Sequence, residues 1–160
     1  MAAWPEPVER VARVLLAAAV DARIEELAEA TPTARAAARV VGCDLAQIVK
    51  SIVFVCDGTY VLALVPGDRR ADEPAVARAV GAAGVRAARA EEVVEATGFE
   101  PGAVAPFPRG RVGEVLMDAA LFHYAVLWAG AGSESHLLSL APAELQRLAG
   151  ARSVELTSRG

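Results

Sequence analysis

The chain has 160 residues, a length typical of one folded domain, and hydrophobic residues make up 54% of it. Because 36 of the residues are alanine, the apolar fraction without alanine is ordinary, which indicates a soluble globular protein. No apolar run approaches the roughly 20 residues needed to span a bilayer. The formal net charge of −4 excludes the broad basic face of a general nucleic-acid binder.

Features of export and of metal binding are missing from the sequence. Its first residues carry no basic segment of the signal-peptide type. Cys43 and Cys56 have neither CxxC nor HxxxH spacing around them, so we expect reduced, buried cysteines in a cytoplasmic protein. We also expect no metal, no cofactor, no membrane partner and no DNA partner.

Lys50 stands out because the other basic side chains are all arginine, fifteen of the sixteen. Exposed ion pairs contribute little to stability, so a surface cation can become arginine at small cost. A surviving lysine then indicates a site that needs a compact ammonium group rather than a planar guanidinium. Chance is the alternative explanation.

The first part of the chain predicts a helix over residues 7–19. Its apolar side would carry Val8, Val11, Leu15 and Leu16. Weak alternation over residues 22–28 favours a first strand. Thr31 and Pro32 are typical of a helix start, with the threonine as cap, and Gly42 is a natural end for that helix.

The clearest local pattern is a β-hairpin. Residues 51–56 and 59–65 are apolar strands separated by Asp57 and Gly58, which form a typical two-residue turn. Because both strands are almost continuously apolar, we expect both of their faces to be covered.

The rest of the chain predicts shorter elements. Helices are expected over 73–80, 90–96 and 142–148, and strands over 85–87, 114–117, 124–129 and 136–140. Glycines and prolines between Gly98 and Gly113 predict a long ordered loop of the kind kept for function. The whole predicts a single α+β (mixed α/β) domain over residues 1–160, with a central mixed, mostly antiparallel sheet or partial barrel surrounded by four to five helices.

Several catalytic motifs are absent. The sequence has no GxSxG elbow and no GxxxxGK[ST] loop. Residues 130–133 begin like a dinucleotide-binding loop, but a tight turn between two strands explains them better. The spacing of His123 and His136 singles out no nucleophile for either.

Five segments, in this order, carry a resemblance to a known family. They are 47–54, 64–70, 97–106, 117–118 and 128–133. Together they resemble the YbaK/EbsC-type aminoacyl-tRNA deacylases, the free-standing relatives of the editing domain inserted in bacterial prolyl-tRNA synthetases. The resemblance extends from about Thr31 to Gly150.

The resemblance implies hydrolysis of the ester that joins a wrong amino acid to the terminal adenosine of a tRNA. The expected substrate is tRNA(Pro) carrying a small amino acid such as Ala or Cys. Such editing has a physical reason, because a pocket discriminates one methylene by only about 1–3 kcal/mol. Family members use no metal, and backbone dipoles and the substrate's own groups assist the attacking water.

The same resemblance implies a set of site residues. Lys50 would contact the terminal nucleotide, and Gly102 would hold substrate and water with backbone groups in a Gly-x-x-x-Pro loop; both are the catalytic candidates. The substrate-binding candidates are Thr31, Thr33, Ser51, Ala103, Val104, Pro106, Asp118, Gly132, Ser133 and His136. Arg69 and Arg70 are candidates for tRNA contact.

Ala103 and Ala105 stand where relatives commonly have glycine and a small polar residue, so we expect a smaller and more apolar pocket. Several candidates also have ordinary structural explanations: helix-start chemistry for Thr31 and Thr33, a turn cap for Asp118 and a structural hydrogen bond for His136.

Two other functions fit the same residues. The chain could be a non-catalytic module that recruits tRNA or a synthetase, with prolyl-tRNA synthetase as the possible partner. It could also be a sensor of a small nucleotide or amino acid.

Overall fold

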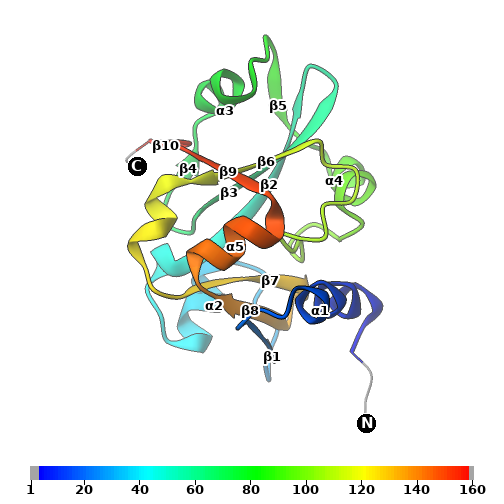
Figure 1. Ribbon diagram of the computed structural model, residues 1–160, viewed down its shortest axis with the longest axis vertical. Coiled ribbons are helices and arrows are strands. Elements are labelled where there is room, and N and C mark those ends of the chain that lie inside the picture. Colours follow the sequence, from blue (N-terminus) through cyan, green and yellow to red (C-terminus); the bar gives the residue numbers. More distant parts are fainter. Residues whose placement is uncertain (1–3, 159–160) are drawn as a thin grey trace.

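The computed structural model describes residues 4–158 and confirms the predicted mixed α/β architecture (Figure 1). The strands are β1 (Arg23–Glu26), β2 (Ile48–Cys56), β3 (Thr59–Pro66), β4 (Arg70–Ala71), β5 (Val85–Ala87), β6 (Glu114–Asp118), β7 (Leu127–Ser133), β8 (His136–Leu140), β9 (Ala151–Val154) and β10 (Thr157–Ser158). The helices are α1 (Glu6–Ala18), α2 (Ala34–Val41), α3 (Glu73–Val80), α4 (Ala90–Thr97) and α5 (Pro142–Ala149), with 3-10 turns at Leu45–Gln47 and Ala119–His123. No helix in this part of the chain is long and apolar enough to cross a membrane.

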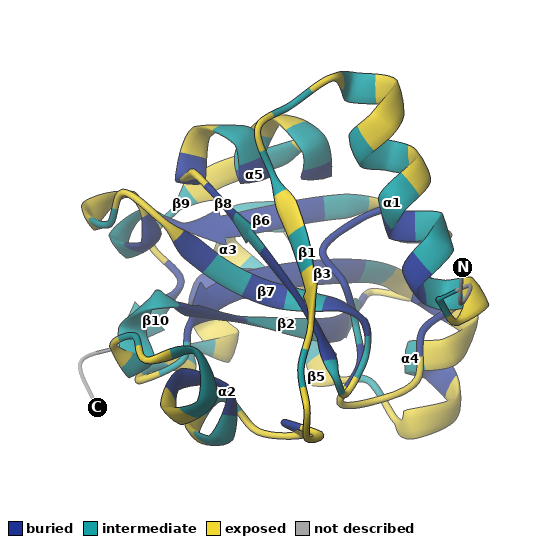
Figure 2. Cartoon of the chain, turned by 90° about the horizontal axis from the view of Figure 1, so that it is seen from below, coloured by how far each residue is buried: buried dark blue, intermediate teal, exposed yellow. Residues whose placement is uncertain are grey.

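Eight strands form one mixed sheet in the order β1-β8-β7-β2-β3-β6-β9, with β5 also pairing to β2. The joins of β2 to β7, β3 to β6 and β6 to β9 are parallel, and the other joins in the sheet are antiparallel. Buried positions concentrate on the central strands, whereas the helices turn exposed residues outward (Figure 2). The apolar runs in β3 and β6 are therefore explained by cover on both faces.

The predicted hairpin is confirmed, and its first strand is longer than expected. Asp57 and Gly58 have φ values of 49° and 80°, the left-handed values that a two-residue hairpin turn of this kind requires. Strand β2 begins at Ile48 instead of Ser51, so Lys50 lies inside the strand.

One edge of β2 is incompletely paired. Strand β3 pairs with β2 along its length, but on the other edge β7 pairs only with Ile48 and Val49, and β5 only with residues 54–56. Between them, the Val53 carbonyl accepts a hydrogen bond of 2.9 Å from the Ala88 N–H, and no strand of the described residues pairs with positions 50–52 on that edge. The sheet therefore lacks a neighbouring strand on this edge of β2 at Lys50 and Ser51.

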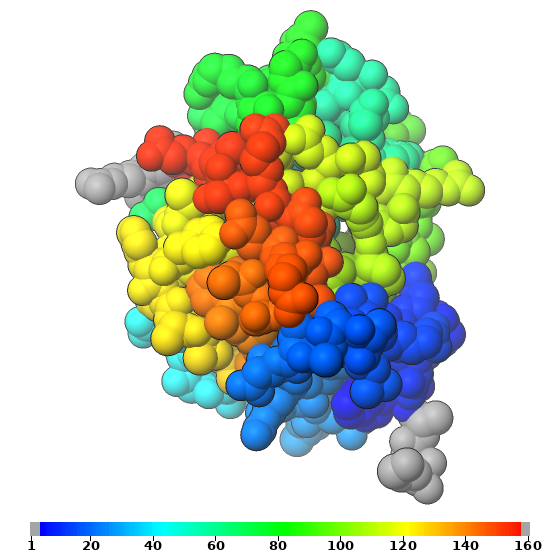
Figure 3. Space-filling model, in the orientation of Figure 1, coloured from blue at the N-terminus to red at the C-terminus, as the bar shows by residue number. Residues whose placement is uncertain are grey.

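Helix α1 fastens the loop 98–113 to the rest of the molecule. Arg10 donates a hydrogen bond of 2.6 Å to the Gly98 carbonyl, and its guanidinium lies 4.7 Å from the centre of the Phe99 ring. In the space-filling view the blue surface of α1 adjoins the yellow-green surface of this loop (Figure 3). Helix α1 also packs on β7, where a Cβ on Gly132 would lie 2.8 Å from the Pro7 backbone.

The apolar side of α1 was predicted only in part. Val8 and Val11 are fully buried, but Leu16 is 82% exposed. The prediction for Leu16 was wrong because the last turns of the helix contact the core through Val14 and Leu15, which leaves Leu16 on the exposed side.

Three expectations about turns were also wrong. Thr33, not Thr31, caps α2, since its hydroxyl accepts a hydrogen bond of 3.1 Å from the Ala36 N–H. Residues 130–133 belong to β7, and the turn follows at residues 134–135. Strand β7 begins at Leu127 instead of Tyr124, because the chain bends at residues 124–125 after a 3-10 turn that Asp118 caps.

Asp118 ties the end of β6 to the C-terminal segment. Its buried carboxylate accepts hydrogen bonds from the Ala120 N–H at 2.8 Å and from the Leu156 N–H at 2.9 Å. Both donors would lose their partner if the carboxylate were removed.

We therefore expect Asp118→Ala to lower the free energy of unfolding by about 2–3 kcal/mol. The change removes the cap of the 3-10 turn and leaves the buried Leu156 N–H without a hydrogen-bond acceptor. Urea unfolding followed by circular dichroism measures this change. Asp72→Ala is the matched control, because the Asp72 side chain makes no cap hydrogen bond, and it should cost less than about 0.5 kcal/mol. Equal costs for the two variants would contradict the assignment.

Candidate functional site

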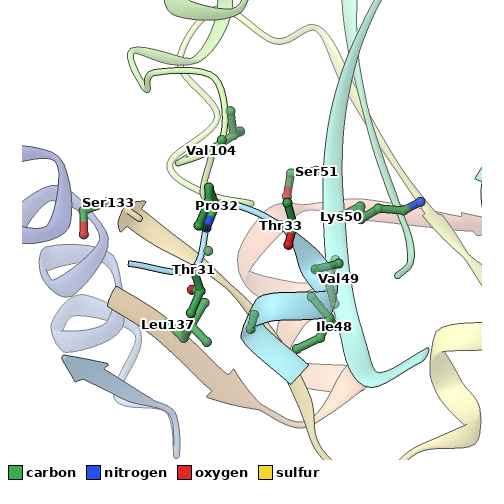
Figure 4. A pocket seen from close by; sticks show the side chains of 14 residues that line it. Thr31, Pro32, Thr33, Ile48, Val49, Lys50, Ser51, Val104, Ser133 and Leu137 are labelled. Carbon is green, nitrogen blue, oxygen red and sulfur yellow. The ribbon is translucent and has the colours of Figure 1, made fainter. Parts of the chain in front are cut away.

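A pocket of about 310 Å³ opens at the incompletely paired edge of β2 (Figure 4). The start of α2, strand β2, the loop 98–113 and the β7–β8 hairpin supply its walls. Of the residues expected from the sequence, those that line it are Thr31, Thr33, Lys50, Ser51, Gly102, Val104 and Ser133. Segments far apart in the sequence thus bring seven of the candidates to one cavity.

The rest of the lining is mainly apolar and was not expected from the sequence. These residues are Pro32, Ala34, Ala37, Ile48, Val49, Gly130 and Leu137. Alanine and valine are common throughout the chain, so nothing in the sequence could have marked these positions. Gly130 did carry a signal, as one of the paired glycines of residues 130–133.

Ser51 is the unexplained polar group of the pocket. Its Oγ is buried and has no hydrogen-bond partner among the described residues. An unsatisfied buried hydroxyl costs free energy, so such a group at a cavity wall indicates a place for a ligand.

Lys50 reaches the other side of β2. Neighbouring side chains of a strand point to opposite faces, and Figure 4 shows the Lys50 ammonium turned away from Ser51. There Lys50 Nζ donates a hydrogen bond to the carbonyl oxygen of Arg69. Burial lowers the pKa of Lys50, the Arg70 cation lowers it further, and Asp68 opposes both.

Arg69 and Arg70 lie next to this ammonium and do not line the pocket. The Arg69 guanidinium is half-buried and donates to Thr157 Oγ1 at 3.4 Å. Arg70 is exposed in β4, which pairs with the C-terminal strand β10. The C-terminal segment therefore holds the turn that accepts the Lys50 hydrogen bond.

Two glycines shape the loop side of the pocket for different reasons. Gly102 is exposed with a φ of 85°, a left-handed value that favours glycine, although a Cβ there would meet no described atom within 4 Å. At Gly130 a Cβ would lie 2.9 Å from the Val104 carbonyl oxygen. Glycine at this position lets the loop approach β7 closely.

Five of the expected site residues lie outside the pocket lining: Ala103, Pro106, Asp118, Gly132 and His136. The Asp118 carboxylate is occupied by backbone N–H groups, and Gly132 faces α1. Ala103, Pro106 and also Ala105 are buried beneath the loop. Ala103 and Ala105 do not line the pocket, and Ala105 packs in the main core, so the expected narrowing of the pocket by these two residues stays a prediction.

His136 touches the pocket only through Ser133. Its Nδ1 lies 2.6 Å from Ser133 Oγ, and Ser133 Oγ also accepts from the Ser135 N–H at 3.1 Å. On the other side of the ring, Nε2 lies 3.5 Å from a carboxylate oxygen of Glu26. His136 is only 2% exposed, and its ring meets Trp4 edge-on.

This chain is similar to a solved structure described as a candidate trans-editing enzyme for prolyl tRNA synthetase. The two are 35% identical with a TM-score of 0.90, over 98% of this chain and all of the other. The uncharacterized protein YwhH of Bacillus subtilis is 31% identical over 76% of this chain and 78% of its own length. A proline–tRNA ligase of Bacillus licheniformis is 34% identical over 72% of this chain, which spans only 21% of that ligase.

The model of one protein family matches residues 28–148, which include the pocket and the elements that build it. That family is described as the aminoacyl-tRNA editing domain. The match covers most of the chain, and the chain belongs to the aminoacyl-tRNA editing domain family.

Proposed function

We propose that this chain is an enzyme that hydrolyses the ester bond of mischarged aminoacyl-tRNA, with tRNA(Pro) carrying Ala or Cys as its substrate. The observation that carries the proposal is the pocket at the incompletely paired edge of β2. The unpartnered Ser51 hydroxyl, Lys50 and the loop residue Gly102 all line it. Residues 1–160 would act as one editing domain, with prolyl-tRNA synthetase as a possible partner.

The size of the pocket supports a small amino acid. At about 310 Å³ it lies at the lower end of the range of ligand pockets, roughly 300–1,000 Å³. Its apolar walls, from Ala37, Ile48, Val49 and Leu137, suit a methyl or thiol-bearing side chain.

Hydrolysis here needs positioning more than a strong base. An ester is already an activated acyl group, so a held water and a polarised carbonyl supply much of the rate. In this proposal the Ser51 hydroxyl donates to the ester carbonyl, and backbone groups at Gly102 hold the water. No side chain is asked to form a covalent bond.

Lys50 would bind the terminal nucleotide of the tRNA. Its ammonium is a compact charge on a flexible stem, so rotation of that stem can exchange the Arg69 carbonyl for a substrate phosphate or ribose oxygen. Arg69 and Arg70, on the turn beside it, would extend this charge toward the acceptor stem.

The alternative is a tRNA- or synthetase-binding module without turnover. One observation favours it: the Lys50 ammonium is hydrogen-bonded to a backbone carbonyl outside the pocket. Such a module would form a complex with mischarged tRNA in a gel shift while leaving the ester intact.

The first test of the proposal uses tRNA(Pro) carrying Ala, Cys, Ser or Pro. We expect rapid hydrolysis of the alanyl or cysteinyl ester, and a loss of kcat/KM of about a hundredfold or more in Lys50→Ala. Lys50→Arg should also be poor, because a planar guanidinium cannot take the place of a compact ammonium. Arg78→Ala, an exposed change on the distant helix α3, is the control. Full activity of Lys50→Ala would refute the assigned role.

Ser51→Ala should separate function from stability. Removing an unpartnered buried hydroxyl leaves the free energy of unfolding unchanged or raises it by up to about 1 kcal/mol. The same change should lower kcat/KM about tenfold to a hundredfold, because the ester carbonyl loses its donor. Paired urea unfolding and deacylation assays measure both. A variant that is less stable and equally active would show that Ser51 is purely structural.

The pH dependence tests the charge on Lys50. Since the ammonium form is needed, activity falls as pH rises through the Lys50 pKa, which burial and Arg70 lower. Arg70→Gln removes a like charge and should move this fall to higher pH. Asp68→Asn removes an opposite charge and should move it to lower pH. The measurement is the pH at which kcat/KM falls to half, after subtraction of uncatalysed hydrolysis, because kcat/KM reports the pKa values of the free enzyme. Shifts in the same direction would contradict the role of Lys50.

A further inference from the structure

The four hydroxyl groups of the pocket differ in what they can still offer a ligand. A hydroxyl has one proton to donate and two lone pairs to accept with. Where the hydroxyl already donates its proton to a protein acceptor, it can offer a ligand only its lone pairs, as a hydrogen-bond acceptor. The hydrogen bonds of these groups therefore define a polarity for each wall of the pocket.

The proton of Ser133 is taken by His136. His136 Nε2 is buried and makes no hydrogen bond within the described chain, but the carboxylate of its cross-strand neighbour Glu26 lies 3.5 Å away. The negative charge of Glu26 favours the tautomer with the proton on Nε2. Nδ1 then has only a lone pair, and the 2.6 Å contact is a hydrogen bond from Ser133 Oγ to Nδ1. The Ser135 N–H uses one lone pair of Ser133 Oγ at 3.1 Å, and the Ser135 hydroxyl lies 3.4 Å from the same oxygen. A ligand that takes the one acceptor site left on Ser133 therefore replaces the Ser135 hydroxyl there.

The hydroxyl of Thr31 also has its proton engaged in a hydrogen bond within the protein. Its hydroxyl donates to the Glu134 carbonyl at 3.2 Å, and its own N–H binds the same oxygen at 2.6 Å. Thr31 is buried, so this geometry is fixed by the β7–β8 turn. Its lone pairs, like that of Ser133, remain available beside the cavity that both residues line.

The opposite wall has the reverse character. Thr33 Oγ1 accepts from the Ala36 N–H and keeps its proton free, and Ser51 Oγ has no partner in the described chain. These two hydroxyls come from the start of α2 and from β2. In the view of Figure 4, Ser51 and Thr33 lie on one side of Pro32 and Ser133 on the other.

We infer that the pocket binds its ligand in one direction, with a cationic donor group, the α-ammonium of the aminoacyl ester, against Ser133 and Thr31 and the ester carbonyl against Ser51 and Thr33. This inference rests on the proposed function and adds the orientation of its substrate. An acceptor wall rejects a ligand that lacks the ammonium, since nothing then replaces the water lost from these oxygens.

Alanyl-tRNA(Pro) and propionyl-tRNA(Pro) test the orientation, because they differ only in the α-amino group. The unmodified chain should prefer the alanyl ester. Ser133→Ala should lower kcat/KM for the alanyl ester about tenfold to a hundredfold, the range for one hydrogen bond to a charged group, and leave the propionyl rate within about twofold. Thr31→Val, which keeps the side-chain shape, should act in the same selective way.

Ser139→Ala is the matched control. It removes a hydroxyl from β8, the strand of His136, at a position outside the pocket, and should leave both rates unchanged. Equal losses on both esters in Ser133→Ala and Thr31→Val, or an unchanged preference, would overturn the inference while the deacylase activity stands. Hydrolysis of neither ester, nor of any other charged tRNA(Pro), by the unmodified chain would overturn the proposed function and the inference together.

Discussion

The structure depends on an incomplete hydrogen-bond ladder along β2. This strand is paired with β3 from Val49 to Cys56, but its other edge changes partner from β7 to β5 and has a gap at positions 50–52. Buried backbone groups are normally paired, so such a gap in the middle of a sheet must be covered by other elements. Here the start of α2 and the loop 98–113 cover it, and the space that they leave is the pocket.

The loop 98–113 can form one wall of that pocket because it is anchored from both sides. Phe99 and Phe107 are buried in the main core, and Arg10 of α1 binds the Gly98 carbonyl. Gly130 lets the strand beneath approach the Val104 carbonyl. A long connection rich in glycine and proline is thus held as firmly as a regular element, which is what a positioned water requires.

Local patterns in the sequence predicted most of the fold. The hairpin around Asp57 and Gly58 and the helix ending at Gly42 follow from turn and cap chemistry, which acts over a few residues. Strands β4, β9 and β10 were missed because such short segments are recognisable only by their pairing with partners distant in the sequence. The same limit applies to the shift of the helix cap from Thr31 to Thr33, since the hairpin residue Glu134 captures Thr31.

Most residues of the candidate site could likewise be predicted from the sequence, but their hydrogen-bond partners could not. Lys50 was marked by composition and Gly102 by its loop, and the resemblance to a family supplied most of the other candidates. Sequence could not show that the Asp118 carboxylate is occupied by two backbone N–H groups, or that His136 acts on Ser133 rather than on the cavity. Both depend on which atoms tertiary packing brings within hydrogen-bond distance.

The strand order also sets when the pocket can come into being as the chain folds. Strand β1 pairs only with β8, and β2 meets β7 through a parallel join, so both pairings wait for segments from the far end of the sequence. Such non-local pairings are slow to form because a long loop must close first. During synthesis the β2–β3 hairpin can fold early, but the cavity is assembled only after the β7–β8 hairpin has left the ribosome.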